Sequence, residues 1–276
     1  MIARRALSTR RQLTSRRSRY TAPALEKGLD ILELLASVSE AMTHSEIASR
    51  LCRTLTEVFR MLVCLEQRGY ISRTGPDERY QLTLKLFEIA HHHHPLQRLI
   101  RHARPLVQRV AGNTSQSCHL AMLNHSEVVV VAQSDAPGNM GFSVRLGANI
   151  DLLNTASGHV ILAFQSDEGR VRALEAWRLR SGAPTPAGIY RHLNRIRRRG
   201  YEELDSYQVH GVVNISYPVL NQHGEAVAAM TVPFLARIGD SVGPPQVKKA
   251  LALASGTLAS AIGGAQPKLS AGAVQP

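Results

Sequence analysis

The chain has few cysteines and no long apolar run. Its three cysteines, Cys52, Cys64 and Cys118, are an odd number with no CxxC pair. The 276-residue sequence therefore predicts neither a disulfide framework nor a zinc ribbon. We expect the cysteines to be small buried apolar residues of a cytoplasmic protein, where thiols stay reduced. No apolar run approaches the roughly 18–20 residues that a membrane span needs, so no membrane partner is predicted.

The sequence also lacks the motifs of common catalytic sites. Ser157 does not lie in a GxSxG nucleophile elbow, no HExxH occurs, and the glycines form no phosphate-cradling loop. His119 falls in a predicted strand, where we expect a structural role. We therefore predict no catalytic residue and no cofactor.

Acidic residues are absent before Glu26, whereas seven arginines precede it. These arginines contribute seven of the formal net charge of +12, so the remaining chain carries +5. The composition predicts a disordered basic arm over residues 1–22. One interpretation is an arm that follows DNA phosphates or enters a minor groove. A transit peptide, or a start codon assigned too far upstream, would give the same composition.

Residues 23–85 have the pattern of a winged helix-turn-helix. An amphipathic helix, ALEKGLDILELLASV, precedes two helices that each begin at a capping box, Thr43-His44-Ser45-Glu46 and Thr54-Leu55-Thr56-Glu57. Two strand-like pieces, YISRT and RYQLTL, flank the turn GPDE. Short helix, tight turn, recognition helix and wing form a DNA-binding motif. Residues 24–85 contain eight Lys/Arg and nine Asp/Glu, so the prediction rests on pattern and not on bulk charge.

The third helix of this segment is the predicted recognition helix. One apolar stripe should pack it against the first helix, formed by Leu55, Val58, Leu62 and Leu65. Polar residues near its N-terminus and in the wing are the DNA-contact candidates, namely Arg53, Thr56, Glu57, Arg60, Arg73 and Arg79. Glu57 has two interpretations: the N3 residue of a capping box, which we favour, or an acceptor for a cytosine amino group.

A second domain is predicted beyond a linker helix over residues 86–95. It covers residues 96–263, and residues 264–276 form a flexible low-complexity tail. Six segments are strand candidates: SCHLAML, EVVVVAQ, GFSVRLG, YEEL, VVNISYPVL and EAVAAMTVPF. They alternate with helices such as TASGHVILAF, DEGRVRALEAW and YRHLNRIRRRG. The arrangement predicts an α+β domain with a mixed sheet.

Four consecutive histidines, His91–His94, suggest a metal site, but their spacing argues against it. Consecutive residues on a helix point in different directions, whereas helical metal pairs prefer an i, i+4 spacing. We favour a solvated or partly packed linker helix and predict no metal ligands. Metal sensing and a pH-sensitive hinge are the alternatives.

The order and spacing of these motifs resemble an IclR-family transcriptional regulator. The resemblance is carried by ALEKGLDILELLA, SEIASRL, LEQRGYI, RYQLTLKLFEIA and, in the second domain, RLGANIDLLNTASGHVILAF and RRRGYEELDSYQVHGVVNISYPVLNQHGEAVAAMTV. It covers about residues 24–263. It implies a GAF-like effector-binding domain, a homodimer or homotetramer, and a palindromic operator in double-stranded DNA next to a catabolic operon.

The resemblance also implies where an effector binds. The pocket would lie between the start of the TASGHVIL helix and the last strands, where a helix N-terminus offers N–H groups to a carboxylate. The implied contacts are Thr155, Ala156, Ser157, Asp205, Asn214 and Thr231, with apolar walls from Met140, Phe142 and Leu146. Thr155 has the alternative role of a simple N-cap, and Asn214 that of a satisfied strand residue.

The sequence therefore predicts a DNA-binding transcriptional regulator of a catabolic operon. A small organic acid, such as an aromatic or keto acid, would bind the second domain and change the spacing of paired DNA-binding domains through the linker. The alternative is a small-molecule-binding module or enzyme to which a helix-turn-helix is appended.

Overall fold

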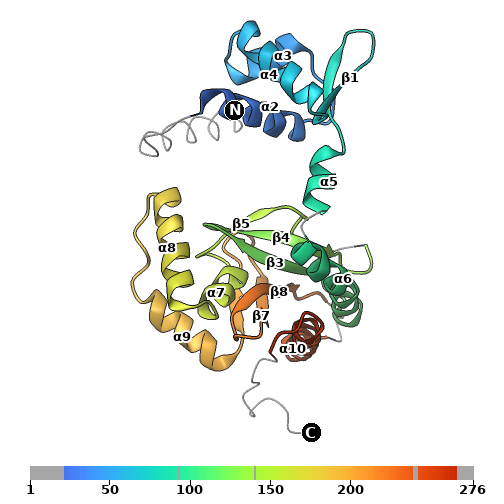
Figure 1. Cartoon of the computed structure of the whole chain (residues 1–276). Coiled ribbons are helices and arrows are strands. Elements are labelled where there is room, and N and C mark those ends of the chain that lie inside the picture. The colour runs from blue at the N-terminus through green and yellow to red at the C-terminus, as the bar shows by residue number, and fades with distance from the viewer. Residues whose placement is uncertain (1–21, 92–93, 140, 239–241, 266–276) are drawn as a thin grey trace. The chain divides into compact units, whose positions relative to one another are not determined.

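The computed structural model describes residues 22–91, 94–139, 141–238 and 242–265 (Figure 1). The chain forms two compact units, residues 1–94 and 95–276. The predicted arm, apart from Ala22, and the tail beyond Ala265 lie outside the described residues. Within the described part of the chain, no helix is both long and apolar enough to cross a membrane.

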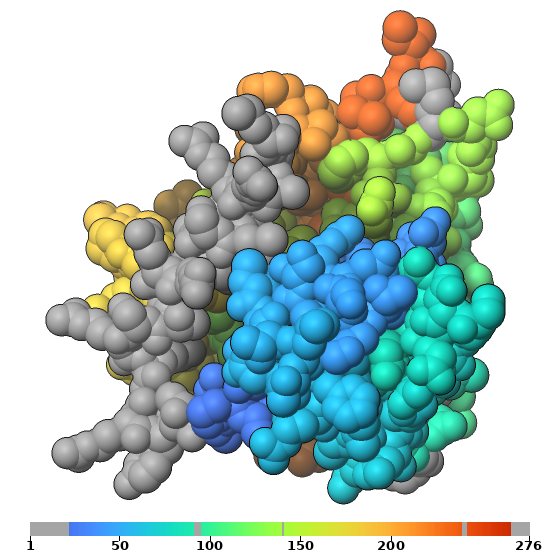
Figure 2. All heavy atoms as spheres, turned by 90° about the horizontal axis from the view of Figure 1, so that it is seen from above, coloured from blue at the N-terminus to red at the C-terminus, as the bar shows by residue number. Residues whose placement is uncertain are grey.

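The first unit is a winged helix-turn-helix. Its elements are α2 (Pro23–Ala36), α3 (His44–Leu51), α4 (Leu55–Gln67), β1 (Ile71–Thr74), β2 (Arg79–Leu82) and α5 (Lys85–His91). The two strands form an antiparallel hairpin, and Met42 adds a bridge to Tyr80. Helices and hairpin share one core, in which Ile31, Ile47 and Leu62 are fully buried. Viewed from above, the blue and cyan atoms of this unit form one continuous surface (Figure 2).

Both predicted capping boxes are present. The Thr43 hydroxyl accepts a hydrogen bond from the Glu46 N–H, and the Glu46 carboxylate accepts one from the Thr43 N–H. Thr54 and Glu57 make the same reciprocal pair at the start of α4. Between them α3 ends at Cys52 in the left-handed conformation, with φ of 52°. Local hydrogen bonds therefore define both ends of the tight turn.

The apolar stripe on α4 is shorter than predicted. Val58 and Leu62 are buried and Leu65 packs partly against the core, but Leu55 is 52% exposed. Leu55 is the first residue of α4 and so stands at the end of the stripe, where no preceding turn supports it.

The prediction of buried cysteines is correct only for Cys118, which is fully buried in the second unit. Cys64 is exposed because it lies on the opposite side of α4 from Val58 and Leu62. Cys52 is exposed in the turn that ends α3.

The second unit is built on a six-stranded sheet in the order β5-β4-β3-β8-β7-β6. Its strands are β3 (Cys118–Asn124), β4 (Glu127–Ser134), β5 (Asn149–Asp151), β6 (Glu202–Asp205), β7 (Val212–Leu220) and β8 (Ala226–Leu235). Every neighbouring pair is antiparallel, so the prediction of a mixed sheet is wrong. Short turns join β3 to β4 and β7 to β8, and such turns produce antiparallel hairpins.

Helices cover both faces of this sheet (Figure 1). One face carries α6 (His94–Thr114) and α10 (Pro244–Ala261), and the other carries α7 (Ala156–Ala163), α8 (Asp167–Ser181) and α9 (Ile189–Arg199). Each face has its own apolar core. The range of the predicted linker helix, 86–95, contains most of α5, which ends at His91, and the start of α6 at His94.

The predicted strand GFSVRLG is not a strand. Residues 141–145 run without regular structure, and a turn follows at 146–147. The Val130 carbonyl accepts a hydrogen bond from Gly147 and the Val130 N–H donates to Ala148, after which regular pairing with β4 begins at Asn149. The alternating apolar and polar residues of this segment therefore do not form a strand, because the residues that follow, Asn149–Asp151, occupy the edge position beside β4.

Gly158 allows α7 to approach the segment that precedes it. A Cβ atom at this position would lie 2.1 Å from the Leu152 carbonyl oxygen. The atoms that the Cβ would meet belong to the Leu152 backbone and not to a flexible side chain that could move away. Only glycine therefore fits at this position.

We expect Gly158→Ala to lower the free energy of unfolding by at least about 1–3 kcal/mol, the usual cost of overpacking. The matched control is Gly112→Ala in α6, where a Cβ meets nothing within 4 Å. The control should be neutral or stabilising by up to about 1 kcal/mol. Urea unfolding followed by circular dichroism measures both; equal midpoints for the two variants would contradict the close approach.

Candidate functional site

Four of the six predicted DNA-contact residues are engaged by opposite charges within the first unit. Arg53 contacts Asp30 at 2.6 Å, and Glu57 contacts Lys27 at 2.6 Å. Arg73 bridges two carboxylates, and Arg79 pairs with Glu46 at 3.2 Å. The positive charges of these three arginines are therefore balanced by carboxylates of the same unit, and a DNA phosphate would compete with those carboxylates.

Thr56, Arg60 and Arg73 are the exposed candidates, and of these Arg73 is held by two carboxylates. Among the described residues, none forms an ion pair with Arg60. The same stretch of α4 also exposes Leu55 and Phe59, the latter at 48%, and sequence reasoning did not select Phe59. Apolar side chains on a recognition helix can contact thymine methyl groups. The aromatic residue Phe59 on the predicted recognition helix was therefore the feature of the sequence that could have identified it as a DNA-contact candidate.

Glu57 is a helix cap, as favoured from the sequence. The Lys27 ammonium, followed by the Thr54 hydroxyl and N–H, lowers the pKa of Glu57 from 4.5 to about 2. The carboxylate is thus ionised at neutral pH. Lys27 offsets the repulsion that an unpaired carboxylate would exert on phosphates.

A polar row crosses the sheet of the second unit on the face that α7 covers. Cross-strand pairing aligns one residue from each of five neighbouring strands: Gln133, His119, Thr231, Ser216 and Glu202. The last four are at most 2% exposed. The residues before and after them along each strand point to the core on the other face of the sheet. The row thus places polar side chains in a buried surface that is otherwise apolar.

At the centre of this row, the Thr231 hydroxyl lies within hydrogen-bonding distance of two other hydroxyl groups. Thr231 Oγ1 lies 2.8 Å from Ser216 Oγ in the sheet and 2.8 Å from Ser157 Oγ on α7. Beside them, His119 Nε2 is buried with no hydrogen-bond partner among the described residues. Burial lowers the pKa of His119 to about 4, so the imidazole is neutral at physiological pH.

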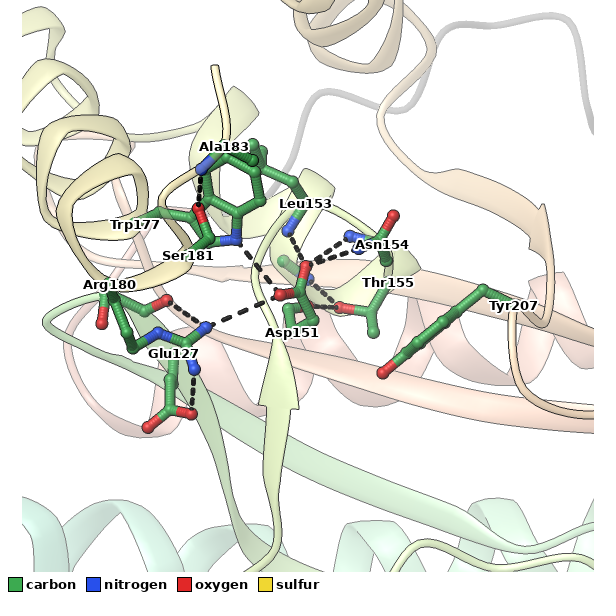
Figure 3. A network of polar contacts seen from close by, with 12 residues as sticks. Glu127, Asp151, Leu153, Asn154, Thr155, Trp177, Arg180, Ser181, Ala183 and Tyr207 are labelled. Atoms are coloured by element: carbon green, nitrogen blue, oxygen red, sulfur yellow. Dashed lines mark hydrogen bonds and ion pairs between the residues drawn. The ribbon is translucent and has the colours of Figure 1, made fainter. Parts of the chain in front are cut away.

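Asp151 holds the start of α7 in place (Figure 3). Its Oδ1 accepts hydrogen bonds from the Leu153 and Asn154 backbone N–H groups at 2.8 and 2.9 Å, and its Oδ2 accepts one from the Trp177 indole at 3.1 Å. The Thr155 hydroxyl donates to the Asp151 carbonyl at 2.6 Å and accepts from the Gly158 N–H. Sequence reasoning missed Asp151; the spacing of an Asp four residues before an N-cap was the available signal.

Tyr207 points toward this turn from the loop after β6 (Figure 3). The side chain is half exposed, and partial burial together with the charge of Asp151 raises the pKa of its phenol. The loop residue therefore places an aromatic ring and a neutral hydroxyl beside the N-terminus of α7. Neither was predicted.

The structure brings together part of the predicted effector set. Ala156 and Ser157 are buried at the start of α7. The Thr155 N-cap is confirmed, and Thr231 lies within hydrogen-bonding distance of Ser157. Asn214 lies on the α7 face of β7, two residues from Ser216 in the row, and is half-buried.

Other members of that set lie elsewhere. Asp205 is exposed and pairs with Val213, so it faces away from Asn214, and in its place Leu204 pairs with Asn214. Leu146 is 59% exposed in a turn and forms no buried wall. Phe142 is half-buried, and its carbonyl accepts a hydrogen bond from Ser117. Met140 lies outside the described residues. Side chains alternate between the two faces of a strand, so the face on which Asp205 lies depends on where β6 begins and how it pairs with β7. The sequence alone gives neither.

No arrangement for nucleophilic catalysis is present at the start of α7. Ser157 is hydrogen-bonded to Thr231 and not to an imidazole. Burial also raises the pKa of the Cys118 thiol, which leaves it unreactive. The geometry instead suits a binding site with a helix N-terminus, hydroxyls and one amide.

A winged helix-turn-helix followed by a domain with such a buried polar site defines a DNA-binding regulator. The chain matches the IclR helix-turn-helix domain over residues 24–75 and the bacterial transcriptional regulator IclR C-terminal domain over residues 92–256. The protein belongs to the IclR family of transcriptional regulators.

Relatives of known sequence and structure agree with this assignment. The chain is 27% identical to the regulator KdgR of Escherichia coli over 212 residues, which is 75% of this chain and 80% of that protein. It is 29% identical over 213 residues to BhcR of Paracoccus denitrificans, covering 76% of each. An IclR homologue of Microbacterium hydrocarbonoxydans, solved with 4-hydroxybenzoate, has the same fold, with a TM-score of 0.71, 22% identity, and 87% and 98% of the two chains covered.

The low pKa of His119 makes stability depend on pH. Between pH 6.5 and about 4 the unfolded chain binds a proton at His119 and the folded chain does not, so the free energy of unfolding falls as the pH falls through this window. The loss by pH 4 is on the order of 3 kcal/mol.

Urea unfolding of the wild type and of His119→Gln across pH 4–8 tests this, because the other histidines are common to both. The free energy of unfolding of the wild type minus that of His119→Gln should fall as the pH drops below 6.5 and be constant above pH 7. Parallel curves throughout would contradict the buried neutral imidazole.

Proposed function

We propose that this regulator controls a catabolic operon and that a small organic acid binds the second unit at the start of α7. The observation that carries the proposal is the pair of buried backbone N–H groups of Ala156 and Ser157. Helix geometry leaves both without an acceptor inside the helix, and Thr155 caps only Gly158. Buried donors of this kind at the positive end of a helix suit a carboxylate.

The polar groups around these donors select the rest of the effector. The amide of Asn214 makes no hydrogen bond within the described part of the chain, and the Tyr207 hydroxyl approaches from the opposite loop. An acid with a second polar group, such as a keto or hydroxyl group, would engage both ends. The 4-hydroxybenzoate bound by the Microbacterium homologue supports an aromatic acid as one candidate.

A palindromic operator requires two copies of the DNA-binding unit. Apolar side chains on two helices of this unit are exposed at 39–73%, namely Leu25 and Leu29 on α2, and Leu84, Leu86 and Ile89 at or within α5. Exposed apolar stripes on short helices favour burial against another chain. We propose a homodimer, or a pair of dimers, in which a bound acid shifts the two DNA-binding units relative to each other.

Arg60 provides the test of the DNA-binding surface. We expect Arg60→Ala to weaken binding to DNA from upstream of the protein's own gene by about 1–3 kcal/mol, because an exposed arginine on the recognition helix loses its phosphate or guanine contact. Arg68→Ala, at the other end of α4, is the matched control and should bind as the wild type does.

Fluorescence anisotropy at several salt concentrations separates the two kinds of contact. A smaller salt slope in Arg60→Ala indicates a phosphate, and relaxed sequence preference indicates a base. An equal loss in both variants would place the DNA away from the start of α4.

Asn214 provides the test of the effector site. Among a panel of keto and aromatic acids, at least one should raise the melting temperature and change operator affinity. For that acid, Asn214→Ala should weaken binding at least about tenfold, since a hydrogen bond to a charged or polar ligand group is lost. Asn113→Ala, exposed on α6, should have no effect. Isothermal titration calorimetry measures both; identical affinities would exclude Asn214 from the site.

A further inference from the structure

Three side chains that can bind a metal converge next to the proposed effector site. His159 comes from α7, His192 from α9 and Glu202 from β6, and their ligand atoms all lie within 4.8 Å of one another. His159 Nδ1 is 3.3 Å from His192 Nε2 and 3.6 Å from Glu202 Oε2, and His192 Nε2 is 2.5 Å from the same oxygen. Within the described residues, no other histidine, cysteine or carboxylate group forms such a cluster. Nothing in the sequence spacing indicated it.

The separations are close to those around a zinc ion. Ligand atoms bound at 2.0–2.2 Å in a tetrahedron lie roughly 3.3–3.6 Å apart. Two of the three separations already have this length. The third, between His192 Nε2 and Glu202 Oε2, would lengthen by about 1 Å, which rotation of the partly exposed His192 ring can supply.

Outer hydrogen bonds already orient two of these ligands. His159 Nε2 donates to the Leu153 carbonyl at 2.9 Å, and this bond directs Nδ1 into the cluster. The other carboxylate oxygen, Glu202 Oε1, accepts from Arg199 at 2.5 Å and from the Glu203 N–H at 2.8 Å. Backbone carbonyls and charged partners that fix the far side of each ligand are typical of protein metal sites.

The remaining oxygen, Glu202 Oε2, is buried and lacks a hydrogen bond. Its short contact with His192 is not aligned as a hydrogen bond, and no other donor among the described residues reaches it. Glu202 is 2% exposed. A buried carboxylate oxygen that accepts no aligned hydrogen bond and has only two imidazole rings beside it is costly, and a cation would satisfy it.

We propose that His159, His192 and Glu202 bind one divalent transition-metal ion of the zinc class, with water in the fourth position. Two imidazole nitrogens exclude Mg²⁺ and Ca²⁺, which require oxygen ligands. The His192 side chain is 31% exposed, so the open position faces solvent. The ion would cross-link α7, α9 and β6. Arg199 lowers the affinity by repulsion, and its contact with Oε1 rather than Oε2 keeps it on the far side of the carboxylate.

The test uses the full-length protein without DNA or acid, so its failure would leave the proposed function standing. All variants carry His91→Ala, His92→Ala, His93→Ala and His94→Ala, which removes the competing histidine run. After chelation, ZnCl₂ is titrated calorimetrically, and CoCl₂ is added to record the visible absorption of the bound ion. We expect one ion per chain, a rise in melting temperature, and a Co²⁺ spectrum of tetrahedral intensity.

His192→Ala and Glu202→Gln should each weaken Zn²⁺ binding by more than about 100-fold, since loss of a ligand exceeds the effect of losing an outer partner. His210→Ala, an exposed histidine of the same unit, is the matched control and should bind as the parent does. Because His192 is partly exposed, its variant is expected to fold, which far-ultraviolet circular dichroism checks. A parent that binds no Zn²⁺ at micromolar concentration, or a His192→Ala variant with unchanged affinity, overturns the proposal and leaves a histidine–carboxylate ion pair.

Discussion

The attachment of the α7 N-terminus to the sheet is the constraint on which the second unit depends. Asp151 fixes the turn before the helix through backbone and side-chain hydrogen bonds, and Gly158 lets the helix lie against the preceding backbone. A helix held at this point cannot slide. Ser157 therefore meets the hydroxyls of the polar row, and His159, one turn beyond Thr155, meets Glu202. One turn of chain thus positions both the proposed effector site and the proposed metal site.

In the first unit, ion pairs between charged side chains dominate the electrostatics. The charges of residues 24–85 nearly cancel, and Arg53, Arg73 and Arg79 each contact a carboxylate of the same unit. Exposed ion pairs of this kind contribute about 0–1 kcal/mol, so a phosphate can replace the internal partner at little cost. Such a surface has weak bulk attraction for nucleic acid. As proposed, its affinity depends on individual side chains of α4 and on pairing two copies.

The elements of the fold could be predicted wherever the determining contacts are local. Thr43 and Thr54 each bond to a residue three positions on, and that spacing is visible in the sequence. Predictions about which side chains lie inside were less accurate. Leu55 and Cys64 have the chemistry of buried residues, but their places on α4 leave them exposed. Asp205 was assigned to the site although the pairing of β6 with β7 turns it away.

By itself, the sequence determined the family, through the order and spacing of motifs along the chain. It also determined the helix caps and the start of α7, because each depends on neighbours within a few positions. The tertiary structure alone decided the polar row and the meeting of His159, His192 and Glu202. Those residues lie as far apart in the sequence as His119 and Thr231, and only strand register and helix packing bring them together. Register depends on pairing energies summed over whole strands, and a shift of one residue would turn every side chain of the row to the other face.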